Sequence, residues 1–122
     1  MSNLAKLAVL AVEQAKLSGE ITRLKKLGSE AYSQCLGNIG TAIGGSCIEK
    51  VATDFRDYRQ EPYNYISFEE FYADSVAEDL VCEHCQLTRK YKADRMVAQR
   101  QLGYVRSAIT RIGKIINSAR GE

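Results

Sequence analysis

Four cysteines are the residues of this 122-residue chain whose side chains could do chemistry together. Cys82 and Cys85 are two residues apart, the spacing at which two thiolates can reach one zinc ion from a tight turn. Cys35 and Cys47 are farther apart, but the four glycines between them free the backbone to bring the two cysteines together. The sequence therefore predicts a structural zinc site at these four cysteines, with His84 as an alternative to one of the distant ligands.

The same cysteines have two other interpretations. A Cys-X-X-Cys pair can be redox-active, although the βαβ pattern that usually surrounds such a pair is missing from this sequence. They can also be ordinary buried thiols. For catalysis the chain offers a single histidine, and adjacent carboxylates such as Glu69 and Glu70 face different directions. Because a four-thiolate site also leaves no open position on the metal, we expect no enzymatic activity.

A long basic helix follows the cysteine pair, from Gln86 to Asn117. Its apolar residues recur at spacings of three and four and form one stripe: Leu87, Tyr91, Ala98, Leu102, Val105, Ile109, Ile112 and Ile116. The opposite face gathers the cations Arg89, Lys92, Arg100, Arg111 and Lys114. Such a face can be an ordinary solvated surface, a track for phosphates or a contact for an acidic partner.

The length of this helix constrains the fold. Thirty-two residues make a rod of about 48 Å, whereas a globule of this chain length has a radius of gyration of roughly 14 Å. The helix must therefore project, break at Gly103 or Gly113, or pair with another helix. Pairing with a second copy of the chain is one alternative, because the apolar spacing suits a seam of two or three helices.

The N-terminal region predicts a second long helix, from Leu4 to about Leu36, with Asn3 as its cap and Ser18-Gly19 as its weak point. Its first turns, Leu4 to Val12, are apolar almost all round. We expect them to be buried against Ile109 to Ile116, or against a second copy in a homodimer.

Two shorter helices are predicted by capping boxes. Ser46 with Glu49 starts one that ends before the only proline, and Ser67 with Glu70 starts the other. The apolar face predicted for these two helices comprises Ile48, Val51, Ala52, Phe55, Tyr58, Phe68, Phe71, Tyr72, Val76 and Leu80. The acidic second helix is expected to form a hairpin with the basic helix. The loop between the short helices carries Tyr63 and Tyr65, which could stack on bases or cover the end of the core.

Composition agrees with one soluble helical domain over residues 1–122, since 45% of residues are hydrophobic and 26% are charged. The longest apolar run, Leu7 to Val12, is far shorter than the roughly 18 residues needed to span a bilayer. We therefore expect a cytoplasmic protein without a membrane partner. The predicted fold is all-α, a small bundle with long N- and C-terminal helices clamped by zinc.

The segment Cys-Glu-His-Cys, the basic sequence after it and Gln-Leu-Gly-Tyr-Val-Arg-Ser-Ala-Ile-Thr-Arg-Ile-Gly-Lys resemble small accessory proteins of phages and prophages. The resemblance covers about the last third of the chain, and it implies a short regulatory protein that acts by binding. The basic face favours nucleic acid as the partner. The alternative is an inhibitor or adaptor that binds a host protein or nucleoprotein complex.

Overall fold

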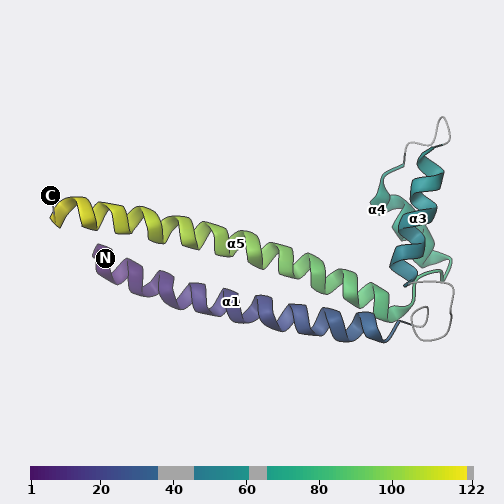
Figure 1. Ribbon diagram of the computed structural model, residues 1–122, viewed down its shortest axis with the longest axis horizontal. Coiled ribbons are helices and arrows are strands. Elements are labelled where there is room, and N and C mark those ends of the chain that lie inside the picture. The colour runs from purple at the N-terminus through teal and green to yellow at the C-terminus, as the bar shows by residue number, and fades with distance from the viewer. Residues whose placement is uncertain (36–45, 61–65, 121–122) are drawn as a thin grey trace. The chain divides into compact units, whose positions relative to one another are not determined.

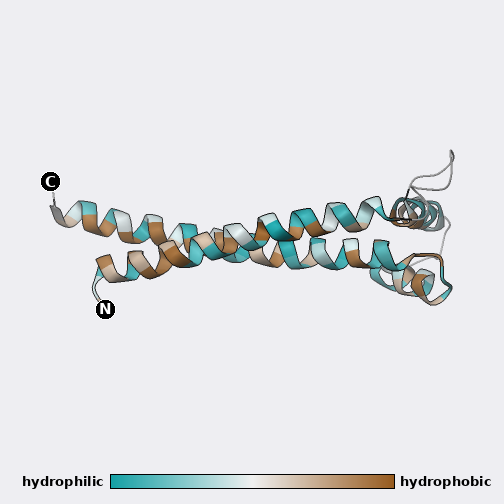
Figure 2. Ribbon diagram, turned by 90° about the horizontal axis from the view of Figure 1, so that it is seen from below, coloured by the Kyte–Doolittle hydropathy of each residue, from teal (hydrophilic) through white to brown (hydrophobic). Residues whose placement is uncertain are grey.

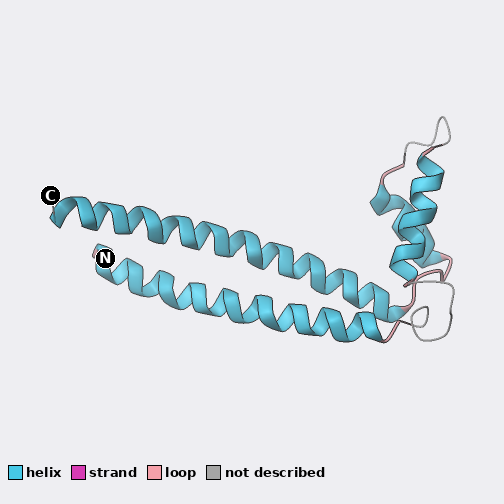
Figure 3. Cartoon of the chain, in the orientation of Figure 1, coloured by secondary structure: helices cyan, strands magenta, loops and turns pink. Residues whose placement is uncertain are grey.

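The computed structural model describes residues 1–35, 46–60 and 66–120. Within these residues the regular structure is entirely helical (Figures 1 and 3), which confirms the expected all-α fold. The helices are α1 (Asn3–Ser33), α3 (Cys47–Arg59), α4 (Phe68–Ala77) and α5 (Glu83–Arg120). The predictions for the glycine-rich stretch after Cys35 and for Tyr63 and Tyr65 lie outside the described residues.

The chain packs into two units. The first unit contains Met1–Lys26 and Tyr91–Glu122, and the second contains Leu27–Lys90. Both long helices therefore contribute residues to both units, while α3 and α4 belong to the second unit alone. All four cysteines lie in the second unit, and most of α5 lies in the first.

The helix α1 begins one residue earlier than the sequence predicted. Ser2 is its cap instead of Asn3, because the Ser2 hydroxyl accepts a hydrogen bond of 3.1 Å from the Ala5 N–H. The helix runs unbroken through Gly19 for 31 residues. It ends at Ser33. The N–H groups of the next two residues, Gln34 and Cys35, donate to the carbonyls of Ala31 and Tyr32.

The helix α5 is 38 residues long and passes through both Gly103 and Gly113 without a break. Each glycine costs about 1 kcal/mol relative to alanine in a helix interior, a cost that the long apolar stripe offsets. Every residue predicted for that stripe is buried or half-buried. The stripe also contains Arg95, which the sequence pattern missed; its Nε atom is buried without a hydrogen-bond partner in the described part of the chain.

Within the first unit α1 and α5 lie side by side, with the N-terminal end of α1 and the C-terminal end of α5 at the same end of the pair (Figures 1 and 2). Leu17 and Ile21 of α1 pack against Ala98 and Leu102 of α5, and Val105 lies against this cluster. Of the alternatives predicted for the long basic helix, the structure therefore shows pairing with another helix of the same chain.

The first turns of α1 are buried only in part: Leu7 and Leu10 are half-buried, but other apolar residues there are exposed. Leu4 is 71% exposed, Val9 57% and Val12 58%. The physical reason is that α5 is a single neighbour and covers one side of α1, whereas these residues occupy other sides of the helix. The alternative that a second copy covers them stays a prediction.

The second unit has a small core of Cys35, Val51, Val81 and Cys85. Around it, aromatic rings of α3 and α4 pack edge to face or tilted, with centroids 5.2 Å apart for Phe55 and Phe68 and 5.4 Å apart for Phe55 and Phe71. The helix α3 starts at the predicted capping box of Ser46 and Glu49. Ser67 caps α4, with its hydroxyl accepting from the Glu70 N–H.

Leu80 is a correction to the predicted apolar face of α4, since it is 49% exposed. The helix ends at Ala77, three residues before Leu80. Asp79 then adopts a left-handed conformation with φ 59°, and the N–H of Leu80 bonds to the carbonyl of Ser75 at 2.9 Å. This pattern is a Schellman motif, which turns the chain and carries Leu80 away from the face of the helix.

In the part of the chain that the structure describes, no helix combines the length and the apolar character that a bilayer crossing requires.

Candidate metal centre

The four cysteines are brought together by the ends of three helices. Cys35 follows the C-terminus of α1, and Cys47 is the first residue of α3. Cys82 stands directly before α5, and Cys85 lies in its first turn. The local sequence explains these positions. Ser46 caps α3 and so makes Cys47 its first residue, and the Cys-X-X-Cys spacing spans the first turn of α5.

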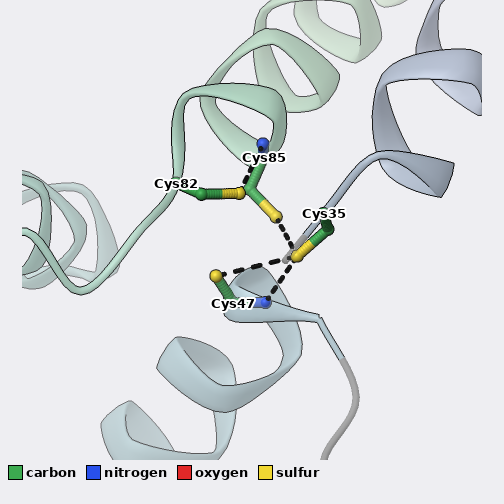
Figure 4. A group of neighbouring side chains, drawn as sticks. All are labelled: Cys35, Cys47, Cys82 and Cys85. Atoms are coloured by element: carbon green, nitrogen blue, oxygen red, sulfur yellow. Dashed lines mark hydrogen bonds between the residues drawn. The ribbon is translucent and has the colours of Figure 1, made fainter. Parts of the chain in front are cut away.

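The four sulfur atoms lie within 4.8 Å of one another (Figure 4). The Sγ atom of Cys35 is 3.1 Å from that of Cys85 and 3.7 Å from that of Cys47. These separations are much longer than the roughly 2.05 Å of a disulfide, and all four residues are free cysteines. A tetrahedral metal with bonds of about 2.3 Å to sulfur separates its ligands by about 3.8 Å, so the cluster could hold a metal ion.

Backbone N–H groups point at the sulfur atoms. The Cys47 N–H donates to the Cys35 sulfur and the Cys85 N–H donates to the Cys82 sulfur, each at 3.4 Å. The second bond makes Cys82 the cap of α5, in the place that a serine or aspartate commonly takes. The N-termini of α3 and α5 therefore both face the cluster, and their partial positive charge favours thiolates.

Burial opposes that effect in the protein without metal. Desolvation is the main cause that raises the pKa of the Cys85 thiol, and the hydrogen bond with Cys35 raises it further. Desolvation likewise raises the pKa of the Cys47 thiol. The buried thiols therefore hold their protons until a cation replaces them, so metal binding must release protons from this centre.

The centre is buried on one side and accessible on the other. Cys35 and Cys85 are fully buried, whereas Cys47 and Cys82 are half-buried and line a hollow of about 550 Å³. His84 lines the same hollow but is not a member of the four-sulfur cluster. The four sulfurs are already enough for a tetrahedral metal, so the alternative that His84 replaces a cysteine is not needed.

Arg89, predicted to lie on the nucleic-acid face, is used inside the second unit. Its guanidinium pairs with the Glu69 carboxylate. It also lies over the Tyr72 ring at 4.2 Å and the Phe68 ring at 5.0 Å from their centroids. One ion pair of the expected kind therefore joins α4 to the start of α5, but the expected hairpin of these two helices is not formed, because α4 packs chiefly against α3. Arg89 is thus not among the solvent-facing cations.

The other four predicted cations, Lys92, Arg100, Arg111 and Lys114, are exposed on α5 in the first unit. None of them forms an ion pair with another described residue. Arg111 and Lys114, together with Arg106, line a shallow hollow of about 550 Å³, and the hydroxyl groups of Ser107 and Thr110 lie in its wall. Its lining residues are Arg106, Ser107, Thr110, Arg111, Lys114 and Ile115.

Arg106 is not among the predicted nucleic-acid-binding cations, although its spacing in the sequence places it in a row with Thr110 and Lys114. It lies four residues before Thr110 and eight before Lys114, so the three side chains follow one another along the helix surface. A second row on the same outer side contains Arg100, the 69% exposed Tyr104 and Arg111. The outer side of α5 therefore presents cations, hydroxyls and one aromatic ring.

Comparisons with protein-family models, with curated proteins and with solved structures give no match to this chain.

Proposed function

We propose that this protein is a small regulatory protein without enzymatic activity, which binds nucleic acid through the outer side of α5 and uses zinc to hold its second unit together. The observation that carries the proposal is a group of exposed cations on α5 that have no ion-pair partner among the described residues, above all Arg106, Arg111 and Lys114 around one shallow hollow. Phosphate groups are the natural counter-ions of such a surface, and the neighbouring hydroxyls can donate hydrogen bonds to phosphate oxygens.

Tyr104 supports nucleic acid as the partner. It is exposed and lies one turn from Arg100 on the same side of the helix. An aromatic ring among cations can stack on an unpaired base while the cations bind the phosphates on either side, as in proteins that bind single strands. We therefore favour single-stranded nucleic acid over duplex, with base stacking worth about 1–3 kcal/mol.

Zinc is the metal we propose for the four cysteines. Four thiolates in a tetrahedral arrangement suit zinc or iron, and a mononuclear zinc site with no open position is structural. The site therefore has an architectural function, since it ties the ends of α1, α3 and α5 together. Elemental analysis of protein purified without chelators should find about one zinc per chain, and a coloured protein containing iron would contradict this assignment.

The test of the function is the salt dependence of binding. Labelled single strands and duplexes of DNA and RNA are titrated with protein while fluorescence anisotropy is measured at several salt concentrations. With about four phosphate contacts, log affinity should fall with a slope of roughly −2.8 against log salt for single strands and −3.6 for duplex DNA. Undetectable binding at about 50 mM salt, where screening is weak, would contradict the proposal.

The double substitution Arg100→Glu and Arg111→Glu should abolish binding without unfolding the protein, since both side chains are exposed. Lys25→Glu with Lys26→Glu is the matched control, because it changes the net charge equally at exposed positions of α1. Equal loss of binding in both variants would mean that net charge, and not the surface of α5, attracts the nucleic acid.

A host protein complex is the second candidate, because exposed tyrosine and arginine are also the residues that dominate protein interfaces. An inhibitor or adaptor of this kind would bind one protein partner with a weak dependence on salt. Tyr104→Ala would then weaken the binding of that protein partner and leave any residual affinity for nucleic acid unchanged.

A further inference from the structure

The first half of α1 carries large apolar side chains that the described part of the chain leaves exposed, beside the half-buried Leu7 and Leu10. Met1 is 82% exposed, Leu4 71%, Val9 57% and Val12 58%. Figure 2 shows that hydrophobic colouring dominates this half of the helix. Large exposed side chains that are grouped in this way are typical of an interaction surface, whereas single ones are normal on any protein.

Most of these residues share one side of the helix. With about 100° per residue, Leu4, Ala8, Ala11 and Ala15 fall in one narrow row, with Met1 and Val12 on its flank. Leu17 and Ile21, which pack against α5, point about 130° away from the centre of that row. We call the row with its flank (Met1, Leu4, Ala8, Ala11, Val12 and Ala15) the outer face of α1. Among residues 1–19 the charged side chains are Lys6, Glu13 and Lys16, and none of them belongs to the outer face.

We propose that the outer face of α1 binds the same face of a second copy of this chain, with the two helices antiparallel. The pattern of side-chain sizes is the first argument. If Ala8 of one copy crosses near Ala11 of the other, Leu4 of each copy lies opposite Ala15 of its partner, and Met1 lies opposite Ser18. Large residues then meet small ones at both ends of the contact, and alanine meets alanine in its middle, where the two helices can approach closely.

A parallel pairing does not have this property. It places Leu4 against Leu4 and Ala15 against Ala15, which crowds one end of the contact and leaves a void at the other. The size pattern therefore favours an antiparallel copy over a parallel one.

Charge is the second argument. A face without charges does not repel its own copy and offers nothing to bind phosphates or a charged peptide. In the antiparallel pairing Lys16 lies opposite residue 3 of the other copy. The two Lys16 side chains are then about 20 Å apart along the helix, well beyond the screening length of about 8 Å at physiological salt. A parallel pairing would place them next to each other.

The size of the face sets the strength of the association. Nineteen residues make a strip about 28 Å long and about 10 Å wide, or about 300 Å² on each copy. Stable interfaces bury about 800 Å² per partner, so this contact alone makes a reversible dimer and not a permanent one. The expected dissociation constant is on the order of tens of micromolar.

Sedimentation equilibrium from about 5 µM to about 200 µM tests the proposal, because a weak dimer must show a concentration-dependent mass. The full chain should change from monomer to dimer over this range. Ala8→Arg, in the middle of the outer face, should keep it monomeric. Ala93→Arg is the matched control, because Ala93 is an exposed alanine of α5, and it should leave the dimer intact. A monomer at every concentration, or a dimer that survives Ala8→Arg, would overturn the proposal.

The direction of pairing has its own test. Leu4→Glu and Ala15→Lys should each abolish the dimer, since each places a charge in an apolar contact. An equimolar mixture of the two variants should restore a dimer, because the antiparallel arrangement places the two new charges opposite each other and leaves the second Leu4–Ala15 contact unchanged. Failure of the mixture to associate would refute the antiparallel register.

A lipid surface is the alternative occupant of an apolar helix face. Vesicles of phosphatidylcholine with phosphatidylglycerol distinguish the two, since they can be sedimented with the bound protein. The expected result is no vesicle binding by the intact chain. Protein that binds these vesicles and stays monomeric in solution would assign the outer face to lipid and contradict the dimer.

Discussion

Cys85→Ser is the substitution that should damage the second unit most. Cys85 is fully buried, and its sulfur lies 3.1 Å from that of Cys35 in the four-sulfur cluster. Serine keeps the size of the side chain but replaces a soft thiolate ligand by a hydroxyl that stays protonated, so a metal bound at this centre would lose one of its four ligands. We expect the variant to contain much less than one zinc per chain.

The magnitude follows from the small core of this unit. Apart from cysteines, the buried residues of its core cluster are Val51 and Val81, which contribute about 1.5–3 kcal/mol each. A structural zinc contributes about 10–16 kcal/mol at pH 7, more than the total stability of about 5–15 kcal/mol of a typical domain. Loss of the metal should therefore unfold α3 and α4, which form about a quarter of the described helix, whereas the pairing of α1 with α5 in the first unit should persist.

Elemental analysis and far-UV circular dichroism measure the two effects. His84→Ala is the control, because His84 lies beside the centre but outside the four-sulfur cluster. It should keep one zinc per chain and the full helical signal. A Cys85→Ser variant with full zinc content and an unchanged melting curve would refute the reasoning, and so would a loss of zinc in His84→Ala.

Four further predictions can be measured by chemical or thermal unfolding. The zinc-loaded protein should lose stability as the pH falls, because protons compete with zinc for the thiolates, whereas the metal-free protein should lack this dependence because α3 and α4 are already unfolded. A zinc-loaded protein whose stability does not fall with the pH would contradict this account. Asp79→Gly should stabilise the second unit by about 0.5–1 kcal/mol, since Asp79 has φ 59° and glycine adopts that conformation without strain. Gly103→Ala should stabilise α5 by about 0.5–1 kcal/mol, because a Cβ atom there meets no atom within 4 Å; a loss of stability would indicate a contact that one chain does not make. Arg89→Ala should destabilise the second unit by about 1–2 kcal/mol through loss of its stacking on Tyr72, and it should leave the affinity for nucleic acid nearly unchanged, unlike Arg100→Glu with Arg111→Glu.

Local sequence determined the helices of this protein. The caps at Ser46 and Ser67 fixed the starts of α3 and α4, because a serine hydroxyl satisfies an N–H group within the same turn. The spacing of apolar residues determined which side of α5 is buried, since that spacing matches the helical period. The two-residue gap between Cys82 and Cys85 likewise placed both sulfurs at one helix start. Each of these features depends on residues a few positions apart.

Tertiary structure decided the features that depend on residues far apart in the chain. The meeting of Cys35 and Cys85, fifty residues apart, requires the ends of two different helices to converge, and spacing alone could only suggest it. Arg89 pairs with Glu69 and lies over the Tyr72 ring because the tertiary structure places α4 near the start of α5. The exposure of Leu4 has the same origin. An apolar pattern shows that a residue can be buried, but only the number and placement of neighbouring helices decide whether it is, and in one chain α1 has a single neighbour in the first unit.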